Sequence, residues 1–275
     1  MENKSKIARS YLRNISKYLD GYNFYEVFIK NNRIELSEFL AQLNKQVPVY
    51  NLSSNMEILE ELYNFLLNNY RNDIIYKIEF IDSIEQFISD ITNSFIVNEF
   101  KFGRNLLDLA VFNGKSVAFE VKSDVDNANN IEKQFKFYSE TFDYCYLITN
   151  EKKVDSLIDK IPTNSGVIFA SDEFEFTLYR QASKNKKISF SRLFRILRKK
   201  EYLDIVRQFY QEIPAVPNTR IFQECYNLLS QVEFEKFKKE FLNKIKEREY
   251  SIRVTDIIQR EKIVRQGYLA NSKIL

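Results

Sequence analysis

Two strand-like segments near the middle of the chain carry the residue types that could do chemistry. They run through residues 106–112 and residues 116–122. Side chains alternate between the two faces of a strand, so the apolar residues at odd positions are expected to share one face. These odd residues are Leu107, Leu109, Val111, Val117, Phe119 and Val121. Asp108, Glu120 and Lys122 then lie together on the other face.

The length of the turn between the segments decides whether the two carboxylates meet. A three-residue loop at Asn113-Gly114-Lys115, in which the glycine supplies a positive φ, pairs odd residues with odd residues. That register places Asp108 directly opposite Glu120. A two-residue Asn-Gly turn would put the two side chains on opposite faces. Because the hydrophobic pattern requires the first register, the sequence predicts a cluster of Asp, Glu and Lys.

Such a cluster suits a hard divalent cation. Neighbouring carboxylates repel each other unless a cation lies between them. Mg²⁺ takes oxygen ligands and keeps waters that can act as nucleophiles, and Lys122 would orient the attacking water and the scissile phosphate. The alternative is a solvent-facing hairpin on which Glu120 and Lys122 form an ordinary surface ion pair.

Composition excludes most other catalytic chemistries. The 275 residues include no His, which removes Ser-His-Asp and Cys-His catalysis and the His-based zinc motifs. Two Cys cannot close a tetrahedral zinc site. Five scattered Gly form neither a phosphate loop nor a dinucleotide fingerprint. Carboxylates, Lys, Arg, Tyr and Ser remain, together with a metal held by oxygen atoms.

A resemblance to a known family rests on six residues: Glu99, Asp108, Glu120, Lys122, Gln134 and Tyr138. Their arrangement, with E-x-K on the second strand and Q-x-x-x-Y on the next helix, resembles the PD-(D/E)XK nuclease superfamily. The Q-x-x-x-Y element is similar to that of the exonuclease domain of bacterial recombination helicase-nucleases. Residues 103–124 also look like an uncharacterised bacterial family with that core. The resemblance covers residues 94–150, with weaker likeness in the helices near 190–248.

The resemblance implies a restriction-endonuclease-like αβββαβ core and hydrolysis of phosphodiester bonds, with DNA as the substrate and Mg²⁺ or Mn²⁺ as the cofactor. It implies that Asp108 and Glu120 bind the metal, and that Lys122 activates water and stabilises the transition state. Glu99 is the first choice for the additional acidic ligand, and Glu85 on the preceding segment is the second.

Gln134 and Tyr138 lie four residues apart, so both can face the site from one side of a helix. The alternative for Tyr138 is a core role, because it belongs to the apolar stripe of Ile131 and Phe135. One departure from the family pattern precedes Asp108, where this chain has Leu107 rather than Pro.

The remaining patterns predict an α/β (α+β) chain with a mixed sheet. Residues 1–83 form an N-terminal helical region, 84–182 the nuclease-like core and 183–275 a basic helical region. Strands are expected at 94–102, 106–112, 116–122, 144–149, 167–170 and 174–179. Helices are expected at 7–19, 37–43, 55–66, 84–91, 127–141 and 154–161, and from 189 to about 264 with a break at Pro214 and Pro217.

Basic residues concentrate in the last third of the chain. Residues 183–275 hold 21 Lys and Arg against 11 Asp and Glu, whereas residues 1–182 hold 20 against 27. A basic surface favours a nucleic-acid backbone as partner. The candidate contacts at helical spacing are Arg192, Arg195, Arg198 and Lys199. Solvated helix faces are the alternative explanation for the same residues.

The setting follows from what the sequence lacks. No window approaches the roughly 18 apolar residues of a membrane span, and the polar start has no signal core. Cys145 and Cys225 lie among apolar neighbours, which is typical of free thiols in a reducing cytosol. We expect a cytoplasmic protein without a membrane partner, and a homodimer stays open. A catalytically silent nucleic-acid-binding or regulatory protein on the same fold is the alternative to a nuclease.

Overall fold

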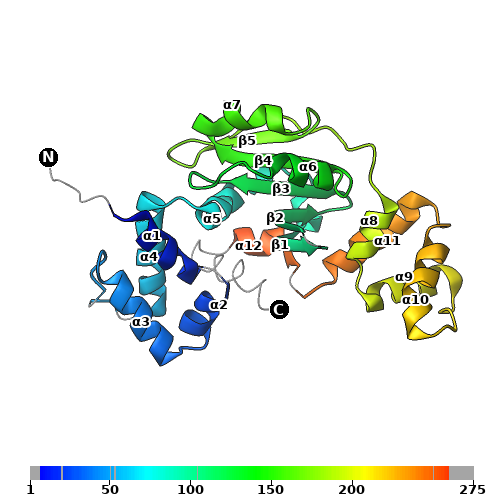
Figure 1. Ribbon diagram of the computed structural model, residues 1–275, viewed down its shortest axis with the longest axis horizontal. Coiled ribbons are helices and arrows are strands. Elements are labelled where there is room, and N and C mark those ends of the chain that lie inside the picture. The colour runs from blue at the N-terminus through cyan, green and yellow to red at the C-terminus, as the bar shows by residue number, and fades with distance from the viewer. Residues whose placement is uncertain are drawn as a thin grey trace.

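A mixed sheet of seven strands occupies the middle of the computed structural model (Figure 1). The structure describes residues 7–19, 21–49, 51–52, 54–103, 105–249 and 251–259. The strands are β1 (Phe95–Phe102), β2 (Asn105–Phe112), β3 (Ser116–Lys122), β4 (Tyr144–Asn150), β5 (Gly166–Ala170), β6 (Phe176–Arg180) and β7 (Ile252–Arg253). They lie in the order β6-β5-β4-β3-β2-β1-β7. β3, β4 and β5 run parallel, and the other neighbours are antiparallel.

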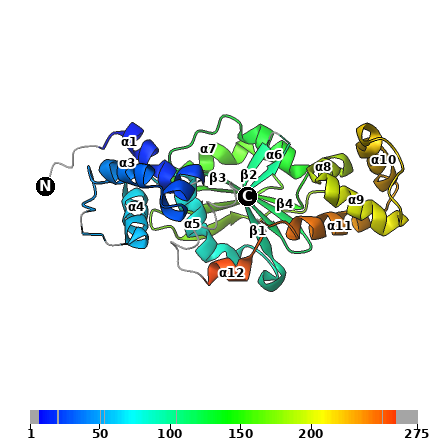
Figure 2. The same ribbon diagram turned by 90° about the horizontal axis from the view of Figure 1, so that it is seen from below.

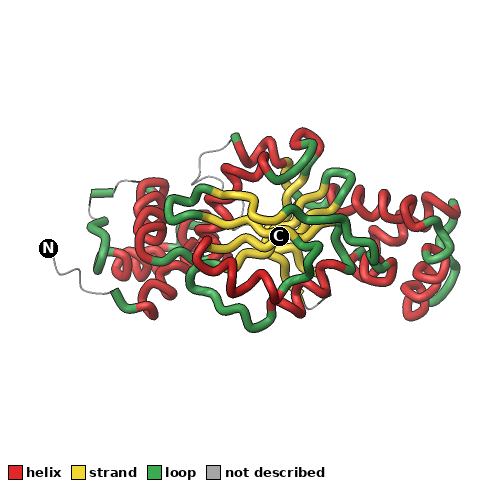
Figure 3. Tube along the Cα trace, turned by 90° about the horizontal axis from the view of Figure 1, so that it is seen from above, coloured by secondary structure: helices red, strands yellow, loops and turns green. Residues whose placement is uncertain are grey.

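Helices gather at both ends of the sheet and on its two faces. Those before the sheet are α1 (Arg9–Ser16), α2 (Gly21–Phe24), α3 (Arg33–Leu43), α4 (Asn55–Asn69) and α5 (Asp73–Ser83). Those after β3 are α6 (Ile131–Ser139), α7 (Val154–Leu157), α8 (Phe190–Ile196), α9 (Lys199–Tyr210), α10 (Asn218–Leu229), α11 (Phe234–Lys246) and α12 (Val254–Ile258). Figures 1 and 3 show α1–α4 at one end of the molecule and α8–α11 at the other, with the strands fanned between them.

The predicted α/β class is confirmed, because a mixed sheet is flanked by an N-terminal and a C-terminal group of helices. The elements α5, β1, β2, β3, α6 and β4 follow one another in the order helix, three strands, helix, strand. That is the order the resemblance implies, and the restriction-endonuclease-like fold itself stays a prediction. None of the helices in the described ranges is long and apolar enough to cross a membrane.

Each face of the sheet has its own apolar core, with α6 and α7 along one side of the strands and α5 and α12 along the other (Figure 2). The core beside α5 contains Leu109, Val111, Val117, Phe119 and Val121. The core beside α6 contains Leu107, Ala110, Phe112 and Ala118. The prediction of a common face for the odd residues is therefore wrong for Leu107. The cause is a break in alternation, where Glu99 of β1 adopts a φ of 52° between two paired stretches of β1 and β2.

The predicted register of the β2–β3 hairpin is confirmed. Phe112 pairs with Ser116 and Leu109 with Phe119, which leaves the three residues 113–115 as the loop. Gly114 has a φ of 88°, a conformation that favours glycine. The hydrophobic pattern and the loop length thus agree on one register, and that register sets Asp108 opposite Glu120.

The helix before β1 lies earlier in the chain than predicted. α5 covers residues 73–83, whereas residues 84–86 form a single 3₁₀ turn and no helix spans 84–91. Asn72 begins α5 by accepting a hydrogen bond from the N–H of Ile75 at 3.3 Å. α5 is buried on nearly all sides, so it has no single apolar stripe for a periodicity search to find. Asp90, with a φ of 54°, turns the chain toward β1 instead.

The sequence predicts helix through the C-terminal region with one break, and the structure differs from this prediction after α11. The expected break is present, because α9 ends at Tyr210 and α10 begins directly after Pro217. After α11, however, Ile252 of β7 pairs with Ile96 of β1 and completes one edge of the sheet. The last part of the predicted helix, residues 260–264, lies outside the described residues.

Candidate active site

Asp108 lies where β2 and β3 separate. The last paired residues at this end of the hairpin are Leu109 and Phe119. Beyond them, Oδ2 of Asp108 accepts a hydrogen bond from the backbone N–H of Val121 at 2.7 Å. The carboxylate therefore takes the place of a strand carbonyl and satisfies an N–H that the ladder no longer pairs. This contact fixes Asp108 within electrostatic range of Glu120.

The carboxylate of Glu120 is buried and accepts three hydrogen bonds. The residue is 2% exposed. Nζ of Lys122 and Nε2 of Gln134 donate to Oε1 at 2.7 and 2.5 Å, and the hydroxyl of Tyr138 donates to Oε2 at 2.7 Å. Gln134 and Tyr138 lie one turn apart on α6, so one helix face supplies both donors. The structure thus brings the E-x-K and Q-x-x-x-Y residues into direct contact.

The pKa values of three residues in this cluster, Asp108, Lys122 and Tyr138, are raised. Burial, followed by the charge of Glu120, raises the pKa of Asp108 well above its usual range, and Lys77 of α5 opposes this shift. Burial lowers the pKa of Lys122, but the nearby carboxylates outweigh it and the net shift is upward. Burial and the charge of Glu120 also raise the pKa of Tyr138. At neutral pH, Lys122 is therefore a cation and Tyr138 a neutral phenol.

Replacement of Asp108 by Asn is expected to stabilise the protein at about pH 8 and to have little effect at about pH 4. A raised pKa means that the folded chain binds this proton more tightly than the unfolded chain. The free energy of unfolding therefore falls as the pH rises from the unfolded pKa of Asp, about 3.9, through the higher folded value. Thermal unfolding followed by circular dichroism should show that the Tm of the Asn variant is a few degrees above that of the wild-type protein at the higher pH. An Asn variant that is less stable at every pH would contradict the account.

Glu99 does not join the other carboxylates. It lies on β1 at the position opposite Asp108, but its left-handed backbone turns it toward α5. There its Oε1 lies 3.4 Å from Nζ of Lys77, a buried residue that also lies 3.6 Å from Oδ2 of Asp73. The alternative ligand, Glu85, is exposed on the 3₁₀ turn after α5. Within the described ranges, no group of three or more His, Cys, Asp or Glu side chains could hold a metal ion.

The donor set nevertheless fits one hard cation. Asp108 and Glu120 interact strongly enough for the charge of one to raise the pKa of the other, and a cation between them would relieve that repulsion. Mg²⁺ is commonly bound by one or two carboxylates, with waters and substrate phosphates completing the shell. Asp108 and Glu120 supply two such carboxylates without a third acidic ligand. Neither lines the adjoining cavity, whose wall instead includes Lys122 and Gln134, two of the donors to Glu120.

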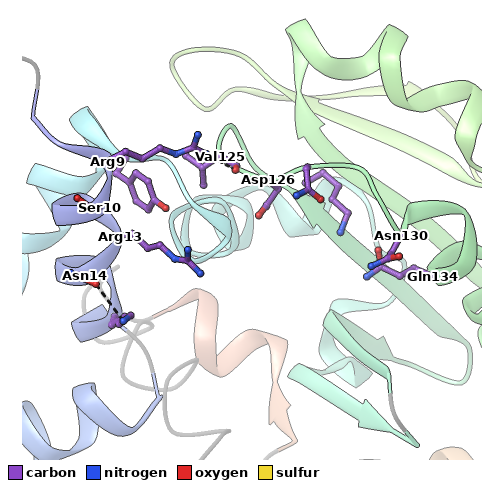
Figure 4. Close-up of a pocket in the computed structure, with 12 residues that line it drawn as sticks. Arg9, Ser10, Arg13, Asn14, Val125, Asp126, Asn130 and Gln134 are labelled. Atoms are coloured by element: carbon purple, nitrogen blue, oxygen red, sulfur yellow. Dashed lines mark hydrogen bonds between the residues drawn. The ribbon is translucent and has the colours of Figure 1, made fainter.

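A cavity of about 900 Å³ adjoins the cluster, with Lys122 and Gln134 in its wall. The opposite wall is α1 and the 3₁₀ turn that extends it, which contribute Arg9, Arg13 and Lys17. Figure 4 shows Arg9 and Arg13 on one side and Asn130 and Gln134 on the other, with Val125 and Asp126 between them. The sequence interpretation did not include these α1 residues among the site residues. The sequence did contain a signal for them, because Arg9, Arg13 and Lys17 recur every four residues between the apolar residues of the same helical segment.

The predicted nucleic-acid contacts lie elsewhere. α8 and α9 are at the end of the molecule opposite α1 (Figure 1). Arg192 is engaged within the fold, since its Nε donates to Glu140 at 2.5 Å and its guanidinium lies 4.0 Å from the ring centroid of Phe137. The other three, Arg195, Arg198 and Lys199, are exposed. The four residues thus include one structural contact and three surface charges.

Comparisons with known proteins place this region in a family. A family model described as Bacteriophage P4 protein cII matches residues 67–270, which include every candidate active-site residue. Protein cII of Enterobacteria phage P4 is 23% identical over 157 residues, covering 56% of this chain and 58% of that protein. This match therefore spans less than two thirds of the relative's length.

A solved structure offers a weaker likeness. A protein of unknown function from Silicibacter pomeroyi is 18% identical and aligns with a TM-score of 0.30 over 45% of this chain and 85% of that chain. A score of this size supports no inference about the fold. The family match is the stronger result, because it covers about three quarters of the sequence. The chain belongs to the Bacteriophage P4 protein cII family.

Proposed function

We propose that this protein is a Mg²⁺- or Mn²⁺-dependent nuclease that hydrolyses phosphodiester bonds, with DNA as the preferred substrate. One observation carries the proposal. Asp108 and Glu120 converge beside Lys122 where β2 and β3 separate, and Gln134 and Tyr138 of α6 hold Glu120 in place. The resemblance to the PD-(D/E)XK superfamily supports the same function and provides the preference for DNA.

In this proposal Asp108 and Glu120 hold the metal. When bound, the cation supplies the positive charge and the activated water that phosphodiester hydrolysis requires. Lys122 acts as a fixed cation rather than as a base, because its raised pKa keeps it protonated at neutral pH. It donates to a phosphate oxygen and stabilises the negative charge that develops there. Tyr138 stays neutral and keeps the carboxylate of Glu120 oriented.

The present contacts of Glu120 also indicate how the site would load. Oε1 of Glu120 already accepts two hydrogen bonds and Oε2 one, so a cation bound at Oε1 would compete with Lys122 and Gln134. Lys122 has the longest flexible stem of the three donors and is 15% exposed at its side chain. Its release from Glu120 would free its ammonium group for the substrate phosphate.

A cleavage assay tests the proposal. Supercoiled plasmid, single-stranded and double-stranded DNA, and RNA are incubated with the protein and Mg²⁺ or Mn²⁺. We expect DNA cleavage that Glu120→Gln reduces by about 100-fold or more, because this change removes the charge and keeps an acceptor for Tyr138. The matched control is Glu132→Gln, an exposed position on α6, the helix that carries Tyr138. Cleavage that persists in Glu120→Gln would refute the assignment of the site.

A second candidate, a nucleic-acid-binding protein that does not cleave, is favoured by the three hydrogen bonds that Glu120 already accepts within the fold. Under this alternative Lys122 and Gln134 remain bound to the carboxylate and no metal is needed. The same assay separates the two, since binding to every substrate without cleavage of any would support the silent protein. Either proposal fits a cytoplasmic protein. Cys145 and Cys225 are free, buried thiols, which is typical of a reducing compartment.

A further inference from the structure

The cavity beside the candidate active site is bounded by positive charge on two sides. Arg9, Arg13 and Lys17 line it from α1 and the 3₁₀ turn that extends α1, and Lys122 lines it from β3. Its other polar lining comes mainly from neutral amides and hydroxyls, such as Asn14. Figure 4 shows that Arg9 and Arg13 extend from α1 toward the loop that follows β3. The cavity is therefore suited to a negatively charged ligand that makes many hydrogen bonds.

The charges of α1 are available to such a ligand. Arg13 and Lys17 are exposed, and neither forms an ion pair within the part of the chain that the structure describes. One acidic side chain, Asp126, lines the cavity. Its Oδ2 already accepts hydrogen bonds from the N–H and the hydroxyl of Ser123, at 3.0 and 2.7 Å. Asp126 therefore does not neutralise the facing cations through a direct contact.

The orientation of α1 argues against an ordinary solvated helix face. Leu12 and Ile15 are buried against the other N-terminal helices, which directs the basic residues away from that core. Arg9 then donates from its Nη2 to the backbone oxygen of Val125 at 2.8 Å and ties α1 to the β3–α6 loop. The basic stripe consequently lines an open cavity, with Arg9 and Arg13 directed toward the β3–α6 loop (Figure 4).

The cavity continues past α1 toward α5. A second cavity of about 480 Å³ shares Arg13, Lys17 and Tyr70 with the first and reaches Asp73. Asp73 lies close enough to Asp108 for its charge to raise the pKa of that residue. The two cavities thus share the basic residues Arg13 and Lys17, and the second extends the first toward α5.

We propose that the stripe of Arg9, Arg13 and Lys17 binds the phosphate backbone of a nucleic acid and aligns it with Asp108, Glu120 and Lys122. This inference rests on the proposed nuclease function and adds the substrate-binding wall. It moves the main backbone contact from the C-terminal helices to α1. The wall is supplied by residues outside the segment 67–270 that matches the family.

The test compares two charge-reversed variants with the wild-type protein. Arg13→Glu/Lys17→Glu alters the stripe, and Lys184→Glu/Lys187→Glu alters two exposed lysines between β6 and α8. Both change the net charge equally. Binding of fluorescein-labelled duplex DNA is measured by anisotropy in EDTA, at several salt concentrations. We expect the stripe variant to bind about 10- to 100-fold more weakly at low salt, with a salt slope smaller by about 2, and the control to bind nearly as the wild-type does.

The outcomes separate this inference from the nuclease proposal. Equal weakening in both variants, or wild-type binding by the stripe variant, would overturn the role of α1. Because EDTA removes the metal, a binding defect confined to the stripe variant stands even if the wild-type protein cleaves nothing. Conversely, cleavage in Mg²⁺ with unchanged binding refutes the stripe and leaves the nuclease intact. Arg13→Gln/Lys17→Gln repeats the measurement without new negative charges, and matching circular dichroism spectra check the fold of every variant.

Discussion

Replacement of Lys238 by Met is expected to lower the free energy of unfolding by about 3–5 kcal/mol. Lys238 of α11 is 5% exposed, and its Nζ donates to Oδ1 of Asp143, which is fully buried. The other oxygen of Asp143 accepts hydrogen bonds from the N–H and the hydroxyl of Ser116 at 2.8 and 3.1 Å. Removing the ammonium group would leave a buried carboxylate with hydrogen bonds but no opposite charge.

The measurement is urea denaturation followed by far-ultraviolet circular dichroism, because the chain has no Trp to report by fluorescence. Lys239→Met is the matched control, since the neighbouring residue is exposed. The double variant Lys238→Met/Asp143→Asn should recover part of the loss by removing both charges. If Lys238→Met costs no more than Lys239→Met, this pair does not hold α11 against the sheet.

Replacement of Lys122 by Ala is expected to reduce DNA cleavage by about 100- to 1,000-fold, measured at a temperature at which the variant is folded. The loss follows from the proposed role of the ammonium group, which stabilises the charge that develops on the phosphate. Glu120 keeps its contacts with Gln134 and Tyr138 but loses its opposite charge, so the free energy of unfolding should fall as well. Initial cleavage rates with Mg²⁺ measure the effect, and thermal unfolding checks the fold.

The control for this experiment is Lys115→Ala, at the other end of the same hairpin. Lys115 lies in the loop between β2 and β3 and is exposed. The Lys115→Ala substitution removes one positive charge from the same hairpin and leaves the environment of Asp108 and Glu120 unchanged. Cleavage by Lys122→Ala at the wild-type rate would exclude the proposed stabilising role, and an equal loss in Lys115→Ala would point to a general effect of net charge.

The centre of the fold could be predicted because its signals are local. The register of the hairpin depends on a period of two along each strand and on one glycine at the turn, and residues 105–122 contain all of this information. The same region therefore yielded the register that brings Asp108 within electrostatic range of Glu120. α6 followed from its own stripe of Ile131, Phe135 and Tyr138, all of which are buried.

Other features depend on distant residues and could not be predicted from a local pattern. α5 is buried on almost every side and includes the buried charges Lys77 and Glu79, so its sequence does not divide into one apolar and one polar face. The departure of Glu99 from the carboxylate cluster depends on Lys77, a buried lysine on that helix. The face of Leu107 depends on the backbone of Glu99. In each case the residue that determines the outcome lies on another helix or strand. The spacing of residues along a single element therefore does not reveal it.

The candidate binding residues illustrate the same limit. Helical spacing identified basic stripes correctly as stripes, both at Arg192–Lys199 and, unused, at Arg9–Lys17. Spacing alone does not reveal what lies opposite a stripe. Arg192 meets Glu140 within the fold, whereas Arg13 meets a cavity. Choosing between the two stripes required the positions of α1 and α8 relative to the sheet.

The pairing of β7 with β1 has a consequence for how the chain folds during synthesis. Phe95 and Ile96 gain their second neighbour only when Arg253 and Ile252 have been made. Until then β1 is an open edge, which can pair with another chain. Closing so long a loop is slow. Because β7 pairs only with Phe95 and Ile96, the end of β1 that it covers is protected only after α8–α11 have been synthesised.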